Sequence, residues 1–156
     1  MMNVKVIDHV ALAVKDLKAA EDNYINKLGA VKLLTHTRLD TLYTVTYLKW
    51  GTSCLTLVQP DDPKCFVQKD IDRKGEGLHH MGIEVDNLAE AEEYFRQQGG
   101  VVGPKETIDN VRTEFVVAPK NNHGLLLQVM EFFPPYKNMN PADRYALLAV
   151  DGLLDK

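Results

Sequence analysis

Residues 6–30 read VIDHVALAVKDLKAAEDNYINKLGA, and residues 77–101 read GLHHMGIEVDNLAEAEEYFRQQGGV. The two stretches align without a gap at an offset of 71 positions, which places His80 on His9 and Gly100 on Gly29. A repeat of this length indicates a duplicated half-domain and not a solenoid of short repeats. The chain therefore contains two related modules.

Each copy predicts a strand, over residues 7–14 and 78–85, followed by a helix. Asp16 and Asn87 are typical N-cap residues, and Glu90 completes a capping box with Asn87. Glycines at 29, 99 and 100 end the two helices, where a left-handed residue is favoured. Apolar residues at helical spacing predict the buried faces of the helices; they are Leu17, Ala20, Tyr24 and Leu28 in the first copy, and Leu88, Ala91 and Phe95 in the second.

Three more strands are expected in each module, separated by the turn residues Gly51-Thr52 and Asn121-Asn122. Their expected ranges are 31–37, 43–50 and 53–59 in the first module, and 101–102, 113–118 and 124–131 in the second. The fold class that follows is α+β: two βαβββ modules paired into one open eight-stranded cavity, with a C-terminal helix. We expect a single domain over residues 1–156, with module one at 5–60, a polar linker with a short helix at 61–76, module two at 77–131 and an extension at 132–156.

The extension lies outside the repeat and is broken by Pro134-Pro135. Asn140-Pro141 has the character of an N-cap and first helical turn, so a helix is expected over residues 142–154. Its apolar residues Tyr145, Leu148 and Leu154 predict packing against the rest of the chain or against a second subunit, and a homodimer is therefore one possibility for the assembly.

Composition excludes several classes of protein. The 156 residues carry a net charge of −4 and show no basic stripe of the kind that binds nucleic acid. No apolar run approaches the roughly 20 residues that span a membrane, and the N-terminus lacks the apolar run of a signal peptide. The spacing of Cys54 and Cys65 fits neither a metal pair nor a disulfide framework, so we expect reduced thiols in a cytoplasmic protein.

Strand alternation predicts which residues face a cavity. Bulky Val10, Leu12 and Val14 should meet the first helix, which leaves His9 with Ala11 and Ala13 on the other face. In the second copy, Met81, Ile83 and Val85 should meet the helix, while His80, Gly82 and Glu84 face the other way. Small residues beside a histidine leave room for a ligand.

Pairing of the modules about a pseudo-two-fold axis would bring His9, Thr56, His80 and Gln128 together, a set that could hold a divalent ion. The set is uncharged, however, and a lone histidine in a strand is more often structural. Glu84 is either a proton-transfer group or one partner of a salt bridge at the cavity rim. The other histidines are expected outside the site: His79 as a packing or surface residue, and His36 and His123 in solvent.

The motifs IDHVALAV, LTLVQP, EGLHHMGIEVDNLAEA and HGLLLQV resemble the methylmalonyl-CoA epimerase branch of the vicinal oxygen chelate superfamily, which also includes lactoylglutathione lyase (glyoxalase I). The resemblance covers roughly residues 5–131. It implies that His9 and His80 bind metal, and that Thr56 and Gln128 occupy the other two ligand positions. The sequence departs from the family at both positions. Thr56 occupies a position that is usually Glu or Gln in the family, and Gln128 occupies the position of a glutamate that both binds metal and moves protons.

A glutamine donates a carbonyl oxygen to a metal but is not a general base. Asp40 is the nearest candidate for the family's other base, and a solvated turn aspartate is the alternative. The candidate catalytic residues are therefore Glu84, Asp40 and Gln128.

The resemblance implies a metal-dependent isomerase that epimerises a small thioester through a chelated enolate, with Co, Ni, Zn, Mn or Fe as the metal. A glyoxalase I-type lyase is one alternative, and a metal-free protein that binds a small molecule is another. A dioxygenase is disfavoured because it needs two histidines and a carboxylate. In each case the expected partner is a small molecule, and not a nucleic acid or a membrane.

Overall fold

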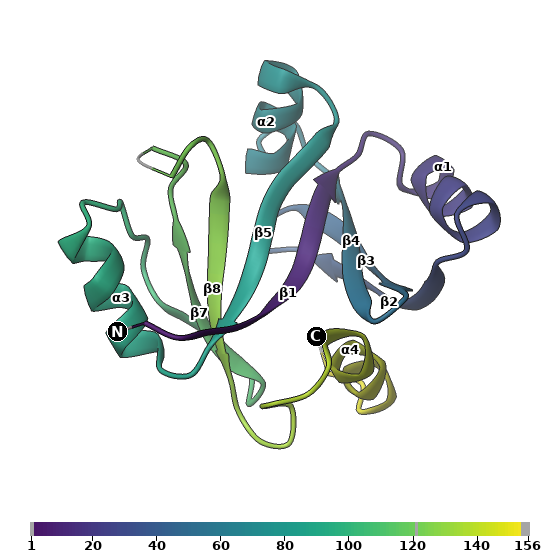
Figure 1. The fold of residues 1–156 in the computed structure, drawn as a ribbon. Helices are drawn as coiled ribbons and strands as arrows, with labels where there is room; N and C mark the ends of the chain where they lie inside the picture. The colour runs from purple at the N-terminus through teal and green to yellow at the C-terminus, as the bar shows by residue number, and fades with distance from the viewer. Residues whose placement is uncertain (1, 121, 154–156) are drawn as a thin grey trace. The chain divides into compact units, whose positions relative to one another are not determined.

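The computed structural model describes residues 2–120 and 122–153 (Figure 1). Within these residues, eight strands follow the hydrogen-bonding order β2-β3-β4-β1-β5-β8-β7-β6. β5 and β8 are parallel, whereas β2–β3, β3–β4, β6–β7 and β7–β8 are antiparallel, so the sheet is mixed. The predicted α+β class with eight strands is confirmed. The bounds are β1 Val4–Ala13, α1 Leu17–Asp22, the π-helix η1 Asn23–Lys27, β2 Val31–Arg38, β3 Tyr43–Trp50, β4 Ser53–Pro60, α2 Phe66–Lys74, β5 Gly77–Val85, α3 Leu88–Gln97, β6 Glu106–Ile108, β7 Arg112–Val117, β8 Leu126–Phe132 and α4 Pro141–Val150.

Contacts within the chain divide it into two compact units. The first takes the described residues of 1–9 and 80–139, and the second takes those of 10–79 and 140–156. β1 and β5 each contribute one part to either unit, so the division does not follow the boundaries of the sequence repeat. The single domain with modules at 5–60 and 77–131 stays a prediction.

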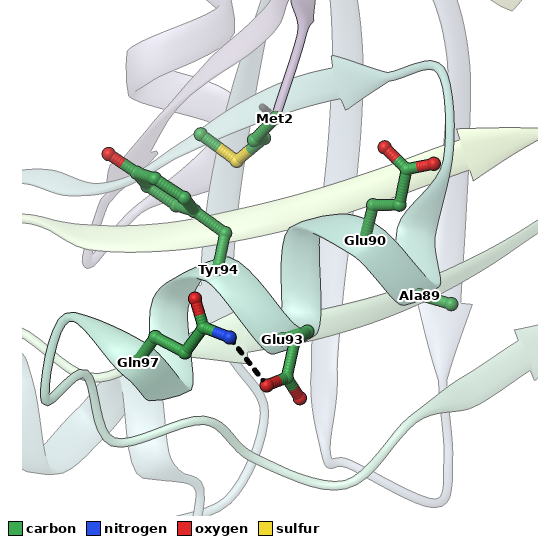
Figure 2. A pocket seen from close by; sticks show the side chains of 6 residues that line it. All are labelled: Met2, Ala89, Glu90, Glu93, Tyr94 and Gln97. Carbon is green, nitrogen blue, oxygen red and sulfur yellow. Dashed lines mark hydrogen bonds between the residues drawn. The ribbon is translucent and has the colours of Figure 1, made fainter.

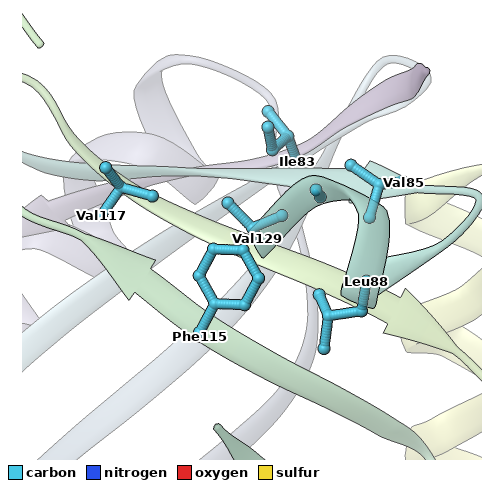
Figure 3. Packing of buried hydrophobic residues seen from close by; sticks show 7 residues of the cluster. Ile83, Val85, Leu88, Phe115, Val117 and Val129 are labelled. Atoms are coloured by element: carbon cyan, nitrogen blue, oxygen red, sulfur yellow. The ribbon is translucent and has the colours of Figure 1, made fainter. Parts of the chain in front are cut away.

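The core of the first unit lies between α3 and one face of its strands (Figure 3). Ile83 and Val85 of β5 are buried there, together with the alternate residues of β7 and β8 and with Leu88 and Ala91 of α3. Phe95 of α3 packs against the same cluster, as its helical spacing predicts. Because successive residues of a strand point to opposite faces, the burial of these residues directs His80, Gly82 and Glu84 to the other face of β5.

The second unit is built in the same way. Val14 and the buried leucines at 48, 55 and 57 form its core, and Leu17, Ala20 and Tyr24 of the first helix pack against them. α4 belongs to this unit, where the ring of Tyr145 stacks on that of Tyr47 at a centroid distance of 4.5 Å. Packing of the C-terminal helix on the rest of the chain is therefore confirmed for Tyr145 and Leu148, while Leu154 lies outside the described residues.

The predicted helix starts are confirmed. The side chain of Asp16 accepts a hydrogen bond from the amide of Ala19, and that of Asn140 accepts one from Ala142. Asn87 accepts from the amides of Ala89 and Glu90, and its side-chain nitrogen also donates to the Glu90 carboxylate at 3.3 Å.

The first helix departs from the prediction at its C-terminal half, because residues 23–27 form a π-helix. A π-turn widens the helix and moves the following side chains around its axis. Ile25 consequently packs against the core, whereas Leu28, predicted to be buried, is 46% exposed.

Two further predictions were wrong. Residues 101–102 form no strand, although Val102 makes an isolated bridge with Val117; the second strand of this module is β6 at Glu106–Ile108. His36, expected in solvent, is 6% exposed because it lies in β2 opposite Val45 of β3. His123 is exposed, as predicted.

Cys54 and Cys65 are both buried. Among the described residues, no helix is long and apolar enough to cross a membrane.

Candidate functional site

His9 of β1 and His80 of β5 meet in the first unit, as the repeat predicts. Their Nε2 atoms are 3.1 Å apart, and the two rings are nearly perpendicular at 87°. His9 is only 4% exposed, so its ring is held among protein atoms. Two imidazole nitrogens that face each other at this distance leave a position between them for a proton or a cation.

Asp8 fixes the orientation of His9. The Asp8 carboxylate is completely buried, and its Oδ2 atom lies 2.7 Å from Nδ1 of His9. Because an ionised carboxylate only accepts hydrogen bonds, Nδ1 of His9 carries the hydrogen and Nε2 presents its lone pair toward His80. A carboxylate behind a histidine in this way is the usual support of a metal-binding imidazole.

Gly82 gives the His9 ring its space. A Cβ atom at Gly82 would lie 2.5 Å from Cε1 and 2.6 Å from Nδ1 of His9, and 2.9 Å from the methyl carbon of Met130. Real Cβ atoms do not approach other atoms so closely. The glycine between His80 and Glu84 is therefore required for the observed position of the first histidine.

Gln128 and Glu114 are hydrogen-bonded on the same face. Gln128 is paired in register with Gly82 across the parallel β5–β8 ladder, so the two residues share a face. Nε2 of Gln128 donates to Oε1 of Glu114 at 2.7 Å. Since a carboxylate accepts hydrogen bonds and does not donate them, the amide nitrogen of Gln128 faces Glu114 and the amide oxygen is directed away from Glu114.

Arg112 holds the Glu114 carboxylate from its other side, where its Nε donates to Oε2. Burial raises the pKa of Glu114, but the Arg112 charge, the hydrogen bonds from Arg112 and Gln128 and the nearby His9 together outweigh it, and the pKa lies below its usual value. Glu114 is consequently an anion near His9.

Sequence reasoning missed Glu114, Asp8 and Arg112. Glu114 alternates with Phe115 and Val117, which are buried against α3, and this alternation within the predicted strand at 113–118 already places Glu114 on the histidine face. The missing information was the register of β7 on β8, which sets Glu114 opposite Met130 and within reach of Gln128.

The other predicted site residues lie in different surroundings. Glu84 is 1% exposed, accepts a 3.4 Å hydrogen bond from the amide of Asn138, and lies 3.9 Å from Nζ of Lys5. Asp40 is an exposed turn residue, and its hydrogen bonds from Arg38 lower its pKa to about 2. Thr56 is buried in β4 of the second unit, and its role as a ligand stays a prediction.

The geometry of the histidines fits a divalent metal ion. Two nitrogens that each lie about 2.1 Å from one ion are about 3.1 Å apart when the angle at the metal is roughly 95°. Among the described residues, no three His, Cys, Asp or Glu side chains lie close enough together to hold an ion. A metal here would therefore depend on His9, His80 and a non-carboxylate donor, for which the amide oxygen of Gln128 is suited.

A shallow hollow on the first unit lies apart from these residues, along the outer side of α3 (Figure 2). Met2 and Tyr94 form its apolar part, and Glu93 accepts a 2.8 Å hydrogen bond from Gln97 at its edge. The hollow contains none of the predicted site residues.

Comparison with known proteins gives relatives of low identity. The uncharacterized protein YqjC of Bacillus subtilis (strain 168) is 26% identical over 128 residues, which cover 80% of this chain and 91% of that protein. The human mitochondrial methylmalonyl-CoA epimerase is 37% identical over 95 residues. That match covers 55% of this chain and 49% of the epimerase, so the chain matches about half the length of this relative.

Solved structures share the fold. A variant of the Streptomyces coelicolor methylmalonyl-CoA epimerase, in complex with 2-nitronate-propionyl-CoA, matches with a TM-score of 0.76 at 23% sequence identity, over 83% of this chain and 98% of that chain. The family model described as Glyoxalase/Bleomycin resistance protein/Dioxygenase superfamily matches residues 8–115, which is more than half of this chain and includes both histidines. The chain therefore belongs to the glyoxalase/bleomycin resistance protein/dioxygenase superfamily.

Proposed function

We propose that this protein is a metal-dependent, epimerase-type enzyme that moves the proton on the α-carbon of a small acyl-CoA thioester. The facing Nε2 atoms of His9 and His80, with Asp8 behind His9, are the observation that carries the proposal. The epimerases among the relatives and solved structures support this choice of reaction and of substrate class.

His9, His80 and the amide oxygen of Gln128 would hold the metal, and Thr56 is the fourth donor that the sequence predicts. A bound divalent ion supplies Lewis acidity, which polarises the thioester carbonyl and makes the α-proton easier to remove. Asp8 keeps the lone pair of His9 directed at the site and fixes the ring before substrate binds.

Proton transfer needs a carboxylate with a suitable pKa. Glu84 shares its strand face with His80 and Gly82 and remains the candidate of choice among the predicted bases, although the Asn138 amide and Lys5 lie close to its carboxylate. Asp40, with its pKa of about 2, is a weak base at neutral pH, and the proposal leaves it out.

Solvent exchange tests this function directly. The protein, loaded with Co²⁺, is incubated with methylmalonyl-CoA in D₂O, and loss of the α-proton signal is followed by NMR against a protein-free sample. We expect exchange above the buffer rate, its loss after chelation and its return with added Co²⁺. Glu84→Gln should lower the rate, and Asp40→Asn is the matched carboxylate control.

A metal-free protein that binds a small molecule is the second candidate, and it is favoured because no three His, Cys, Asp or Glu side chains of the described residues are arranged to hold an ion. Exchange no faster than in buffer, together with no Co²⁺ bound, would exclude the epimerase and leave this candidate. Exchange that survives chelation would contradict the role of the metal alone.

A further inference from the structure

The residues around Gly82 lie on one strand face. Met130 of β8 is paired with Glu84 in β5 and with Glu114 in β7, and its methyl group shares the space over Gly82 with the His9 ring. Gln128, paired with Gly82, is two residues before Met130 in β8 and therefore has the same orientation. The Glu114–Gln128 hydrogen bond is formed on the face that carries the histidines.

A glutamine side chain has two ends of opposite character and nearly equal size. Its nitrogen only donates and its oxygen only accepts, so an amide at a cation site binds or repels the cation according to which end faces it. The 2.7 Å hydrogen bond to Glu114 engages the nitrogen end. The oxygen end is consequently directed away from Glu114.

Arg112 fixes Glu114 in turn. Arg112 is 5% exposed and the Glu114 side chain is 13% exposed, so this ion pair is shielded from solvent. Charge-assisted hydrogen bonds of this kind are shorter and stronger than neutral ones. The hydrogen bonds from Arg112 and Gln128 therefore hold the Glu114 carboxylate beside Gln128, which is itself a neutral donor.

We propose that Glu114 is a positioning residue that directs the amide oxygen of Gln128 toward the cation site of His9 and His80 and supplies the negative charge that this donor set lacks. Asp8 and Glu114 then have parallel tasks, since each carboxylate orients one neutral donor. The inference rests on the proposed function through its metal site.

Titration with Co²⁺ tests the inference without substrate. Binding is followed by calorimetry and by the visible absorption of Co²⁺, which reports its coordination, for the wild type, Glu114→Gln, the exchange variant Glu114→Gln/Gln128→Glu and the control Glu106→Gln, an exposed glutamate of β6. We expect Glu114→Gln to weaken Co²⁺ binding about 10–100-fold, as loss of a supporting carboxylate does in other metal sites. The exchange variant, which keeps one carboxylate and one amide in the pair, should regain at least the wild-type affinity.

Wild-type affinity in Glu114→Gln would overturn the inference. Weak binding in both Glu114→Gln and the exchange variant would also overturn it, because the loss would then reflect damage around Arg112 and not the carboxylate–amide pair. Circular dichroism of each variant reports whether it is folded. If the wild type itself binds no Co²⁺, both this inference and the proposed metal function are contradicted. If the wild type binds Co²⁺, His9→Ala does not, and Glu114→Gln binds Co²⁺ as tightly as the wild type, only this inference is contradicted.

Discussion

At the scale of single residues, two neutral donors of the candidate site, His9 and Gln128, each have a carboxylate beside them. Asp8 is adjacent to His9 in the chain, whereas Glu114 reaches Gln128 from the neighbouring strand β7. Such supports fix the donor geometry before a ligand arrives, so that binding does not have to order the side chains.

Replacing the support of His9 should weaken metal binding. In Asp8→Asn the side chain keeps its size, but its amide can present a donor to Nδ1 of His9 and so reverse the tautomer that directs a lone pair at the site. We expect Co²⁺ affinity to fall about 10–100-fold, measured by calorimetry. Asp109→Asn, at an exposed turn residue with a φ of 46° that asparagine tolerates, is the matched control and should bind as the wild type does.

A single methyl group at Gly82 should disrupt the histidine pair. Gly82→Ala places a Cβ atom 2.5 Å from the His9 ring, which is only 4% exposed, so the ring or the strand has to shift. We expect the free energy of unfolding to fall by about 1–3 kcal/mol in urea titrations, and metal binding to be lost. Gly103→Ala, whose Cβ atom would lie 3.0 Å from the half-exposed side chain of Val116 and 3.5 Å from the carbonyl oxygen of that residue, should retain metal binding. Equal loss in both variants would contradict the specific role of Gly82.

How far sequence predicts the site depends on where each residue lies in the repeat. His9 and His80 occupy equivalent positions of two similar stretches, and their meeting follows from that symmetry. Glu114 has no counterpart in the quoted motifs, and its distance from Gln128 depends on a strand register that the sequence does not state. Asp40 is the opposite case: the resemblance to the family points to it as a base, but the sequence does not reveal that it is exposed and paired with Arg38.

At the scale of elements, the helices begin where their caps predict, and the differences arise inside or after them. The spacing of apolar residues predicts an α-helix but does not reveal the π-turn at residues 23–27. Because of this turn, Leu28 is exposed and not buried as predicted. The missed strand β6 has only three residues, all outside the core, so its burial pattern carries no period-two signal.

The N-cap of α3 should contribute to the stability of the first unit. Asn87 accepts hydrogen bonds from two amides of the first turn, at 3.0 and 3.1 Å, and alanine leaves both without this acceptor. We expect Asn87→Ala to lower the free energy of unfolding by about 1 kcal/mol in urea titrations. Asn87→Asp, which keeps a cap oxygen, should stay near the wild-type value, and a loss as large as that of alanine would argue against the cap.

The packing of α2 against the start of β5 should make stability depend on pH. Burial lowers the pKa of His79, with Asp70 acting in the opposite direction and Lys74 in the same one. Below the usual pKa near 6.5, the unfolded chain therefore binds a proton that the folded chain resists, and the free energy of unfolding falls as the pH drops through this range.

Urea unfolding between pH 5.5 and 7.5 measures this effect in the wild type and in His79→Gln. The variant lacks the titrating ring, so its stability should change less with pH than that of the wild type. His123→Gln, at an exposed residue, serves as the control and should follow the wild-type profile. Parallel profiles in all three proteins would show that His79 does not cause the dependence.

At the scale of the whole molecule, duplication explains how a chain of 156 residues obtains two histidines at equivalent positions. The two compact units do not coincide with the two copies, because the first half of β1 is grouped with the second copy. His9 is thereby in the same unit as His80, Glu114 and Gln128, and the candidate site is formed by strands from both ends of the sequence. The fold is shared with a solved structure of 23% sequence identity.

Metal content measured by elemental analysis, on untagged protein purified without chelators, tests the central claim most directly. We predict near-stoichiometric cobalt, nickel, zinc, manganese or iron in the wild type, and its loss in both His9→Ala and His80→Ala, since each removes one of the two facing nitrogens. Absence of metal from the wild type, with no binding of added ions, would contradict the claim and leave a metal-free binding protein as the better description. Metal retained in both variants would place the ion elsewhere in the chain.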